Sequence, residues 1–192
     1  DLSKYSILYL PVPVMLSAAT ATKLRAWVEA GGTLIAEGCP AYFGDGGHVG
    51  VVQPNLGLDE LFGARESYVE FTPDILGDLR LTVKGFPLWG GIFMQAYTPT
   101  SGKAVGWYED GQVAAVENHY GKGRTLLIGT MVGAGHGAHG GSANSPALAK
   151  RKTAWHCAWH STNLSRSRSC HPRSSAIECP ACWDRHRQLR SQ

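Results

Sequence analysis

The chain has 192 residues, of which 43% are hydrophobic and 17% charged, so it is long enough for one ordinary domain with a buried core. No apolar run approaches the roughly 18 residues that a membrane-spanning helix needs, and we expect no membrane partner. The net charge of +3 conceals two unlike parts. Residues 1–148 are acidic overall, residues 149–192 are strongly basic, and every glycine lies at or before Gly141. We therefore expect a domain at 1–141 and a basic tail rich in Cys, His, Arg and Ser at 142–192.

The first part of the chain follows a strand–helix–strand pattern. SILYLPV at 6–12 is a short apolar run ended by prolines, which is typical of a buried strand. Ser17 is a suitable N-cap for a helix that runs to Ala30, where two glycines end it. TLIAE at 33–37 is the next apolar run. This order favours two parallel strands joined by a right-handed crossover.

The pattern becomes β-rich after a long glycine-rich loop at 38–56 and a short helical turn at 57–63. Asp110-Gly111 is a good hairpin turn. Short apolar runs bounded by turn residues lie at 68–71, 79–83, 91–97, 104–109, 112–120 and 124–130. We expect an α/β fold: a partly parallel sheet with helices, a β-rich hairpin region and a disordered tail.

Three longer stretches are informative because of the order in which they occur. They are YSILYLPVPVMLSAATATKLRAWVEAGGTLIAEG, LGLDELFGARESYVEF and AAVENHYGKGRTLLIGT. Together they resemble the trimerisation domain of glycoside hydrolase family 42 β-galactosidases, over roughly residues 1–141. The resemblance implies a flavodoxin-like sheet related to class I glutamine amidotransferases, placed after a TIM-barrel catalytic domain, with a role in assembling a trimer. The parent reaction would be hydrolysis of terminal β-D-galactosides by a retaining mechanism with two carboxylates.

The chain departs from the family pattern at both ends. Asp1 falls where the family domain is already under way, and after about Gly141 the family's next helix is not recognisable. We therefore expect the strand at 6–12 to lack a neighbour and the isolated chain to be marginally stable and prone to association. The resemblance implies a non-catalytic scaffold whose partners are other subunits of a homo-oligomer, the missing barrel and, through the parent enzyme, a carbohydrate. No basic-then-apolar leader follows Asp1, so we expect a cytoplasmic protein.

Cys39 is the candidate nucleophile of a rival hypothesis, a stand-alone amidotransferase-like enzyme. It follows an apolar strand and Gly38, as in a nucleophile elbow. Pro40, however, has no N–H to donate to an oxyanion. A thiol also needs a histidine to activate it, and His119 and His136 are candidates only because they exist. We expect Cys39 to lie at the rim of a degenerate site.

An aromatic-rich β region supports a third hypothesis, a carbohydrate-binding module. Such side chains stack on sugars, line subunit interfaces or, most often, fill the core of a sheet. The candidates are Trp89, Phe93, Tyr97, Trp107 and Tyr108. A glycosidase needs two carboxylates held across a sugar site, but the sequence pairs none of its acidic residues, and we expect them on a solvated surface. The acidic residues considered are Glu37, Asp45, Asp59, Glu60 and Glu117.

GAGHGAHGG at 133–141 contains a formal G-x-G-x-x-G. A dinucleotide fingerprint must open a helix, and the Ser-Ala-Asn-Ser-Pro that follows is a poor helix start. We expect a flexible glycine loop and no cofactor. His136 and His139 have no third metal ligand in view.

The basic tail has three interpretations. Cys179 and Cys182 have the spacing of zinc ligands, with His186 near in sequence, but only one such pair occurs. The positive charge with interleaved tryptophans suggests nucleic-acid binding, yet no recognisable fold presents it. We favour the third, translation of coding DNA in the wrong frame, because the composition changes abruptly where the family likeness ends. On that hypothesis the tail is disordered.

Overall fold

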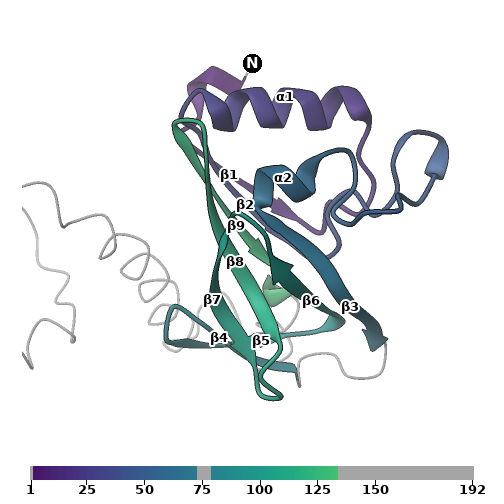
Figure 1. The fold of residues 1–192 in the computed structure, drawn as a ribbon, viewed down its shortest axis with the longest axis vertical. Coiled ribbons are helices and arrows are strands. Elements are labelled where there is room, and N and C mark those ends of the chain that lie inside the picture. The colour runs from purple at the N-terminus through teal and green to yellow at the C-terminus, as the bar shows by residue number, and fades with distance from the viewer. Residues whose placement is uncertain (1, 73–78, 134–192) are drawn as a thin grey trace, which may run out of the picture. The chain divides into compact units, whose positions relative to one another are not determined.

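The computed structural model describes residues 2–72 and 79–133 (Figure 1). The helices are η1 (Leu2–Lys4), α1 (Ala18–Glu29), η2 (Asp45–Gly47) and α2 (Leu58–Phe62), where η marks a 3-10 helix. The strands are β1 (Ile7–Pro11), β2 (Thr33–Glu37), β3 (Ala64–Thr72), β4 (Leu79–Val83), β5 (Phe86–Gly90), β6 (Ile92–Pro99), β7 (Lys103–Tyr108), β8 (Val113–Tyr120) and β9 (Gly123–Ile128). Seven strands form one sheet in the order β1-β2-β9-β8-β7-β4-β5, and β3 pairs with β6.

The parallel part of the sheet is the predicted strand–helix–strand unit, extended by β9. Strand β1 is parallel to β2, with Ile7 opposite Thr33, and β2 is parallel to β9. Helix α1 begins after Ser17, whose side-chain oxygen accepts the N–H of Thr20 at 3.2 Å. The predictions of these two strands, of the helix and of its cap are confirmed.

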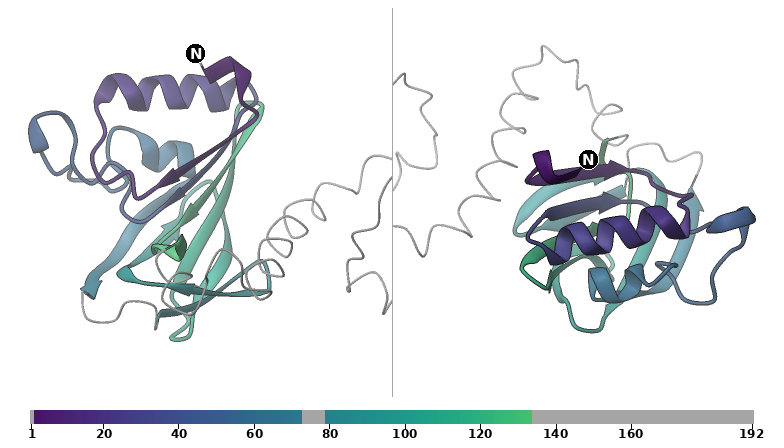
Figure 2. Two further views of the ribbon diagram at one scale, coloured as in Figure 1. Left: turned by 180° about the vertical axis from the view of Figure 1, so that it is seen from behind. Right: turned by 90° about the horizontal axis from the view of Figure 1, so that it is seen from above.

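Helices α1 and α2 lie on the same side of the sheet (Figures 1 and 2). Side chains alternate between the two faces of a strand, and on β2 it is Leu34 and Ala36 that contact the helices. Burial of this apolar surface is the main force that holds the helices in place. The buried core contains Ala21, Leu24, Val28, Leu34, Ala36, Leu58, Leu61, Phe62, Val116 and Leu127.

The described residues are richer in β-structure than the sequence predicts. Strands β9, β8, β7, β4 and β5 are joined by antiparallel pairing. The hairpin at Asp110-Gly111 is confirmed, since the Tyr108 N–H donates to the Gln112 carbonyl at 3.0 Å. The coarse prediction of a partly parallel sheet with helices therefore holds, whereas a flavodoxin-like arrangement is not confirmed by this mixed, curled sheet.

Strand β5 is absent from the sequence-based expectation. Pro87 and the closing glycine argue against a strand. Strand β5 lies at the end of the strand order, and edge strands are where sheets tolerate proline. Strand β3 is also longer than the predicted run at 68–71, and its pairing with β6 continues across a register shift between Glu66 and Tyr68.

Strand β1 is the other edge of the sheet among the described residues, as predicted. Its side chains Ile7 and Tyr9 are 47% and 46% exposed. An apolar edge strand invites association, so the low stability and self-association of the isolated chain stay a prediction. None of the helices within 2–72 and 79–133 is long and apolar enough to cross a membrane.

Gly129 gives a test of how tightly β6 packs against the end of β9. Its carbonyl accepts the Gln95 N–H at 2.7 Å, and a Cβ at this position would lie 1.7 Å from the Gln95 carbonyl oxygen. We expect Gly129→Ala to lower the free energy of unfolding by about 3 kcal/mol or more, measured by urea denaturation.

Gly111→Ala is the matched control. A Cβ at Gly111 meets no atom within 4 Å, and its φ of +86° adds only backbone strain, which costs about 1 kcal/mol. Equal losses from the two substitutions would show that the contact of β6 with Gly129 is not tight.

Candidate functional site

Cys39 lies on a sharp turn directly after β2. Gly38, Cys39 and Ala41 all have positive φ angles, of 62°, 47° and 55°. A non-glycine residue in this region is uncommon and is found in strained turns, including nucleophile elbows. The backbone path at Cys39 therefore resembles an elbow, as the sequence suggests.

The amides of this elbow are all occupied. Cys39, Ala41 and Tyr42 each donate their backbone N–H to a protein oxygen, and Pro40 has none to give. The acceptors are Gln95 Oε1 for Cys39 (3.1 Å), the Pro13 carbonyl for Ala41 (2.8 Å) and the Cys39 carbonyl for Tyr42 (3.2 Å). An oxyanion hole needs amides aimed at free space, so this turn has no such hole.

The Cys39 thiol is also poorly placed to act as a nucleophile. The residue is 3% exposed, and burial, followed by the nearby charge of Glu66, raises the pKa of the thiol to about 12. His119 lies opposite Arg124 near the start of β9, whereas Cys39 follows the far end of the same strands. The end of the strands near His119 and the end near Cys39 are four residues apart, about 13 Å, so His119 does not activate Cys39. His136 lies outside the described residues.

Gln95 closes the space beneath the elbow. It is 1% exposed, its Oε1 accepts from the Cys39 N–H and the Tyr97 hydroxyl, and its Nε2 donates to the Glu66 carboxylate. Its backbone carbonyl accepts the Tyr108 hydroxyl at 3.0 Å. A buried polar network with its members paired in this way gives rigidity, and nothing in the sequence ties Gln95 to Cys39.

The predicted aromatic residues divide into two sets. Tyr97 and Tyr108 are 2% and 4% exposed and belong to the core around Gln95. Trp107 is 44% exposed, and Trp89 and Phe93 are half-buried. The Arg80 guanidinium lies over the Trp89 ring at 4.6 Å. Only the second set is accessible to a partner.

The acidic residues hold structural contacts. Asp45 Oδ2 accepts the Ala18 N–H at 2.9 Å, at the start of α1. Glu37 is 2% exposed, and its Oε2 accepts the backbone N–H of Val132 at 2.9 Å. The others form ion pairs: Glu60 with Arg25 (2.9 Å), Asp59 with Arg65 (3.1 Å) and Glu117 with Lys84 (2.8 Å). The expectation of solvated surface residues is wrong for Glu37, because the sheet buries its position at the end of β2.

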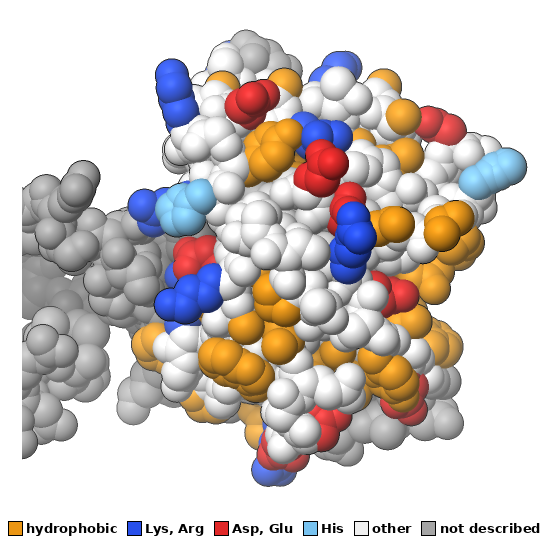
Figure 3. Space-filling view, in the orientation of Figure 1, with side chains coloured by type: hydrophobic (Ala, Val, Ile, Leu, Met, Phe, Trp, Pro, Cys, Tyr) orange, Lys and Arg blue, Asp and Glu red, His pale blue; other side chains and the backbone are white. Residues whose placement is uncertain are grey.

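Exposed apolar side chains gather on the loop at 43–52, here called the valine loop. Val49, Val51 and Val52 are 53%, 104% and 39% exposed, and Met15 beside the loop is 66% exposed. The loop projects from the rest of the described chain, and Figure 3 shows hydrophobic side chains at and below it. The glycine-rich sequence predicts a loop here but not the exposure of these side chains, although the valines of HVGVV in a glycine-rich turn are a signal that could have marked them.

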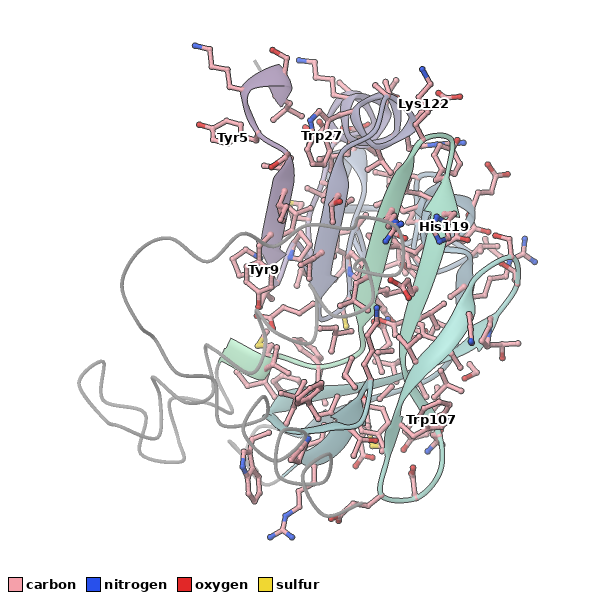
Figure 4. All side chains as sticks on the ribbon, turned by 90° about the vertical axis from the view of Figure 1, so that its left-hand side faces the viewer. Tyr5, Tyr9, Trp27, Trp107, His119 and Lys122 are labelled. Atoms are coloured by element: carbon pink, nitrogen blue, oxygen red, sulfur yellow. The ribbon has the colours of Figure 1, made fainter. Side chains whose placement is uncertain are left out.

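An open groove lies between η1 and the last turns of α1, here called the N-terminal groove. Its volume is about 630 Å³. Tyr5 and Trp27 lie at this end of the molecule (Figure 4), and the Trp27 indole N–H donates to the Leu2 carbonyl at 3.0 Å. The lining residues include Leu2, Tyr5, Lys23, Ala26, Trp27 and Ala30.

Metal ligands do not gather in the part of the chain that the structure describes. Within 2–72 and 79–133, no three His, Cys, Asp or Glu residues are placed to hold an ion. The zinc-ligand candidates Cys179, Cys182 and His186, the histidines of the glycine loop and the predicted domain boundary after residue 141 all lie outside the described residues.

A family model described as the β-galactosidase trimerisation domain matches residues 1–149. The chain belongs to this family. The closed elbow and the exposed apolar surfaces described above are thus features of a trimerisation domain. No curated protein matches the chain.

Solved structures share the fold of this trimerisation domain. A β-galactosidase from Bacillus circulans sp. alkalophilus has a TM-score of 0.61 at 16% identity, covering 73% of this chain and 23% of that one. One from Halorubrum lacusprofundi has 0.61 at 21%, covering 72% and 22%. An exo-β-1,4-mannosidase from Opitutaceae bacterium strain TAV5 has 0.58 at 15%, covering 87% and 27%. The chain therefore spans about a quarter of the length of these relatives or less.

Alkylation of Cys39 tests the closed elbow of the trimerisation domain. We expect the Cys39 peptide to stay unmodified by iodoacetamide at neutral pH in the folded protein and to be modified fully in guanidinium, because only a thiolate reacts and the pKa is about 12. Peptide mass mapping separates Cys39 from the other four cysteines. Rapid, selective modification of Cys39 in the folded chain would instead favour the enzyme.

Glu37 predicts how the stability of the trimerisation domain depends on pH. Burial raises the pKa of its carboxyl above the usual 4.5, although hydrogen bonds from Tyr9, Val132 and Gly133 oppose the shift. The folded chain therefore keeps a proton on Glu37 that the unfolded chain has lost, and the free energy of unfolding falls as pH rises above about 4.5.

We expect Glu37→Gln to flatten that fall, because glutamine still offers an oxygen to the Val132 N–H but does not ionise. Urea denaturation over a pH series measures the slope. Glu29→Gln, at an exposed position on α1, is the control for the change in net charge. The same slope in wild type and Glu37→Gln would mean that Glu37 has the same pKa folded and unfolded.

Proposed function

We propose that this chain is the oligomerisation and scaffold part of a β-galactosidase-like glycoside hydrolase and carries no catalytic centre of its own. The observation that carries the proposal is the family match over residues 1–149. The parent reaction would be hydrolysis of terminal β-D-galactosides by a retaining two-carboxylate mechanism. Its carboxylates would belong to a TIM-barrel domain outside this chain.

The chemistry of the described residues supports a scaffold. The elbow amides at Cys39, Ala41 and Tyr42 already have acceptors, and the thiol is buried. The surface supports association, because the valine loop and β1 expose apolar side chains that solvent does not stabilise. The partners in this proposal are other copies of the chain in a homotrimer, the barrel domain and, through the barrel, a galactoside.

We further infer that the fold derives from an amidotransferase-like, flavodoxin-like sheet. The β1-α1-β2 unit supports this origin, as does a cysteine at positive φ directly after a parallel strand. The accessible aromatics Trp89, Phe93 and Trp107 remain candidates for contact with the barrel or with a neighbouring subunit.

We also propose that the domain ends between residues 141 and 149, and that the rest is an out-of-frame product. The family match ends at residue 149, which supports the boundary. Reading the parent DNA in its other two frames tests the tail, and the proposal fails if neither frame encodes a helix that resembles the family.

Two measurements on the full chain test the scaffold function. Sedimentation velocity should show a concentration-dependent trimer, and a chromogenic β-galactoside should not be hydrolysed above the rate in buffer. A thermally robust monomer at all concentrations would contradict oligomerisation. Hydrolysis above the rate in buffer would contradict the absence of a catalytic centre, and its loss in Cys39→Ser would assign it to Cys39.

A further inference from the structure

We propose that copies of this chain assemble head to tail, with the valine loop of one copy seated in the N-terminal groove of the next. The inference rests on the proposed function, because it names the surfaces through which the oligomer would form. The occupant of the groove is thus a second copy of this chain.

The valine loop is exposed and ordered, as a loop that inserts into a partner needs to be. Val51 is fully exposed, and the loop is ordered by its own backbone contacts, with the Gly44 N–H donating to the His48 carbonyl at 2.8 Å. At its base, the Phe43 N–H donates to the Val14 carbonyl at 2.9 Å, and the Leu16 N–H to the Phe43 carbonyl at 3.1 Å. A pre-organised loop loses little conformational entropy on binding.

The N-terminal groove has a matching character. Lys23, Ala26, Trp27 and Ala30 recur at the spacing of one helix face, and η1 supplies the opposite wall. The groove volume of about 630 Å³ is within the range of pockets that take several apolar groups. Trp27 is held by its bond to the Leu2 carbonyl, so this wall is rigid as well.

Charge and position also fit. Asp45 is the only Asp, Glu, Lys or Arg in the sequence of the valine loop, which also contains His48, and Lys23 is the only such residue among the groove's lining residues. These opposite charges favour the same pairing. The loop is fastened at the first residue of α1, and the groove lies along the last turns of that helix (Figures 1 and 2).

The separation of the two surfaces decides the symmetry. A trimer with three-fold symmetry uses a heterologous interface, in which two different patches meet. A loop meeting a loop would be isologous and would stop at a dimer. Two distinct patches at the two ends of α1 form the pair that a heterologous interface needs, and such an interface gives a ring where its rotation closes and a filament where it does not.

The experiment uses sedimentation velocity on the full chain and two blocked variants. Val51→Asp puts a charge on the loop, and Ala26→Arg fills the groove; both positions are exposed in the single chain. We expect each variant to raise the dissociation constant about 30-fold or more and to run as a monomer. Circular dichroism spectra and thermal melting show whether each variant is folded. Val49→Asp serves as a second loop variant.

Mixing the two variants gives the decisive readout. Val51→Asp keeps an intact groove and Ala26→Arg keeps an intact loop, so the mixture should form a 1:1 dimer that cannot grow. The matched controls are Tyr68→Asp, a side chain 43% exposed on β3, and Thr22→Arg, which is on α1 but not among the groove's lining residues. Both controls should remain trimeric.

Three outcomes would overturn the inference. If wild type is a trimer and either blocked variant stays trimeric, the interface lies elsewhere while the proposed function stands. If the mixture stays monomeric, the loop and the groove are not partners. If wild type is itself a monomer at every concentration, the scaffold function fails together with the inference.

Discussion

Strand β9 is the element on which both parts of the molecule depend. It is parallel to β2 on one side and antiparallel to β8 on the other, so it joins a strand–helix–strand unit to a run of hairpins. Just past its end, Gly129 accepts the Gln95 N–H and donates to the Ala114 carbonyl at 2.8 Å. The first bond fixes β6 against the end of β9 and so sets the position of Gln95, and the second ties the same glycine to β8.

The fixed position of Gln95 determines what the elbow at Cys39 can do. Its side-chain oxygen takes the Cys39 amide, and its nitrogen bonds to Glu66. A turn of this shape has catalytic use only if its amides face a developing negative charge. Here the same amides face protein oxygens. The backbone therefore keeps the path of an elbow, but the turn has only a structural role and packs directly on the core.

Local signals explain why the first half of the fold is predictable. Ser17 as a cap, the glycines after Ala30 and two short apolar runs depend only on near neighbours in sequence, and they predict β1, α1 and β2 closely. Strand β5 is not predictable in that way, because only the sheet order reveals that Pro87 lies at an edge.

The candidate site shows the same limit more sharply. Pro40 reveals from sequence that one elbow amide is missing, but the partner of the Cys39 amide lies 56 residues away, on a strand of the other sheet. The exposure of the aromatic residues is also not predictable from sequence. Trp107 and Tyr108 are neighbours in sequence, and only the packing of the sheet decides that Trp107 is exposed and Tyr108 is buried.

The closed elbow and the projecting loop share one set of backbone hydrogen bonds. The chain leaves Cys39, and Ala41 donates to the Pro13 carbonyl, which uses an amide that an oxyanion site would need. Two residues later Phe43 bonds in both directions to the same segment, through the Val14 carbonyl and the Leu16 N–H. This short ladder both occupies the elbow and sets the direction in which the valine loop leaves the domain. A change that freed the Ala41 amide by releasing the segment at 13–16 would also release the base of the valine loop, so the occupied amide and the ordered loop depend on the same backbone bonds.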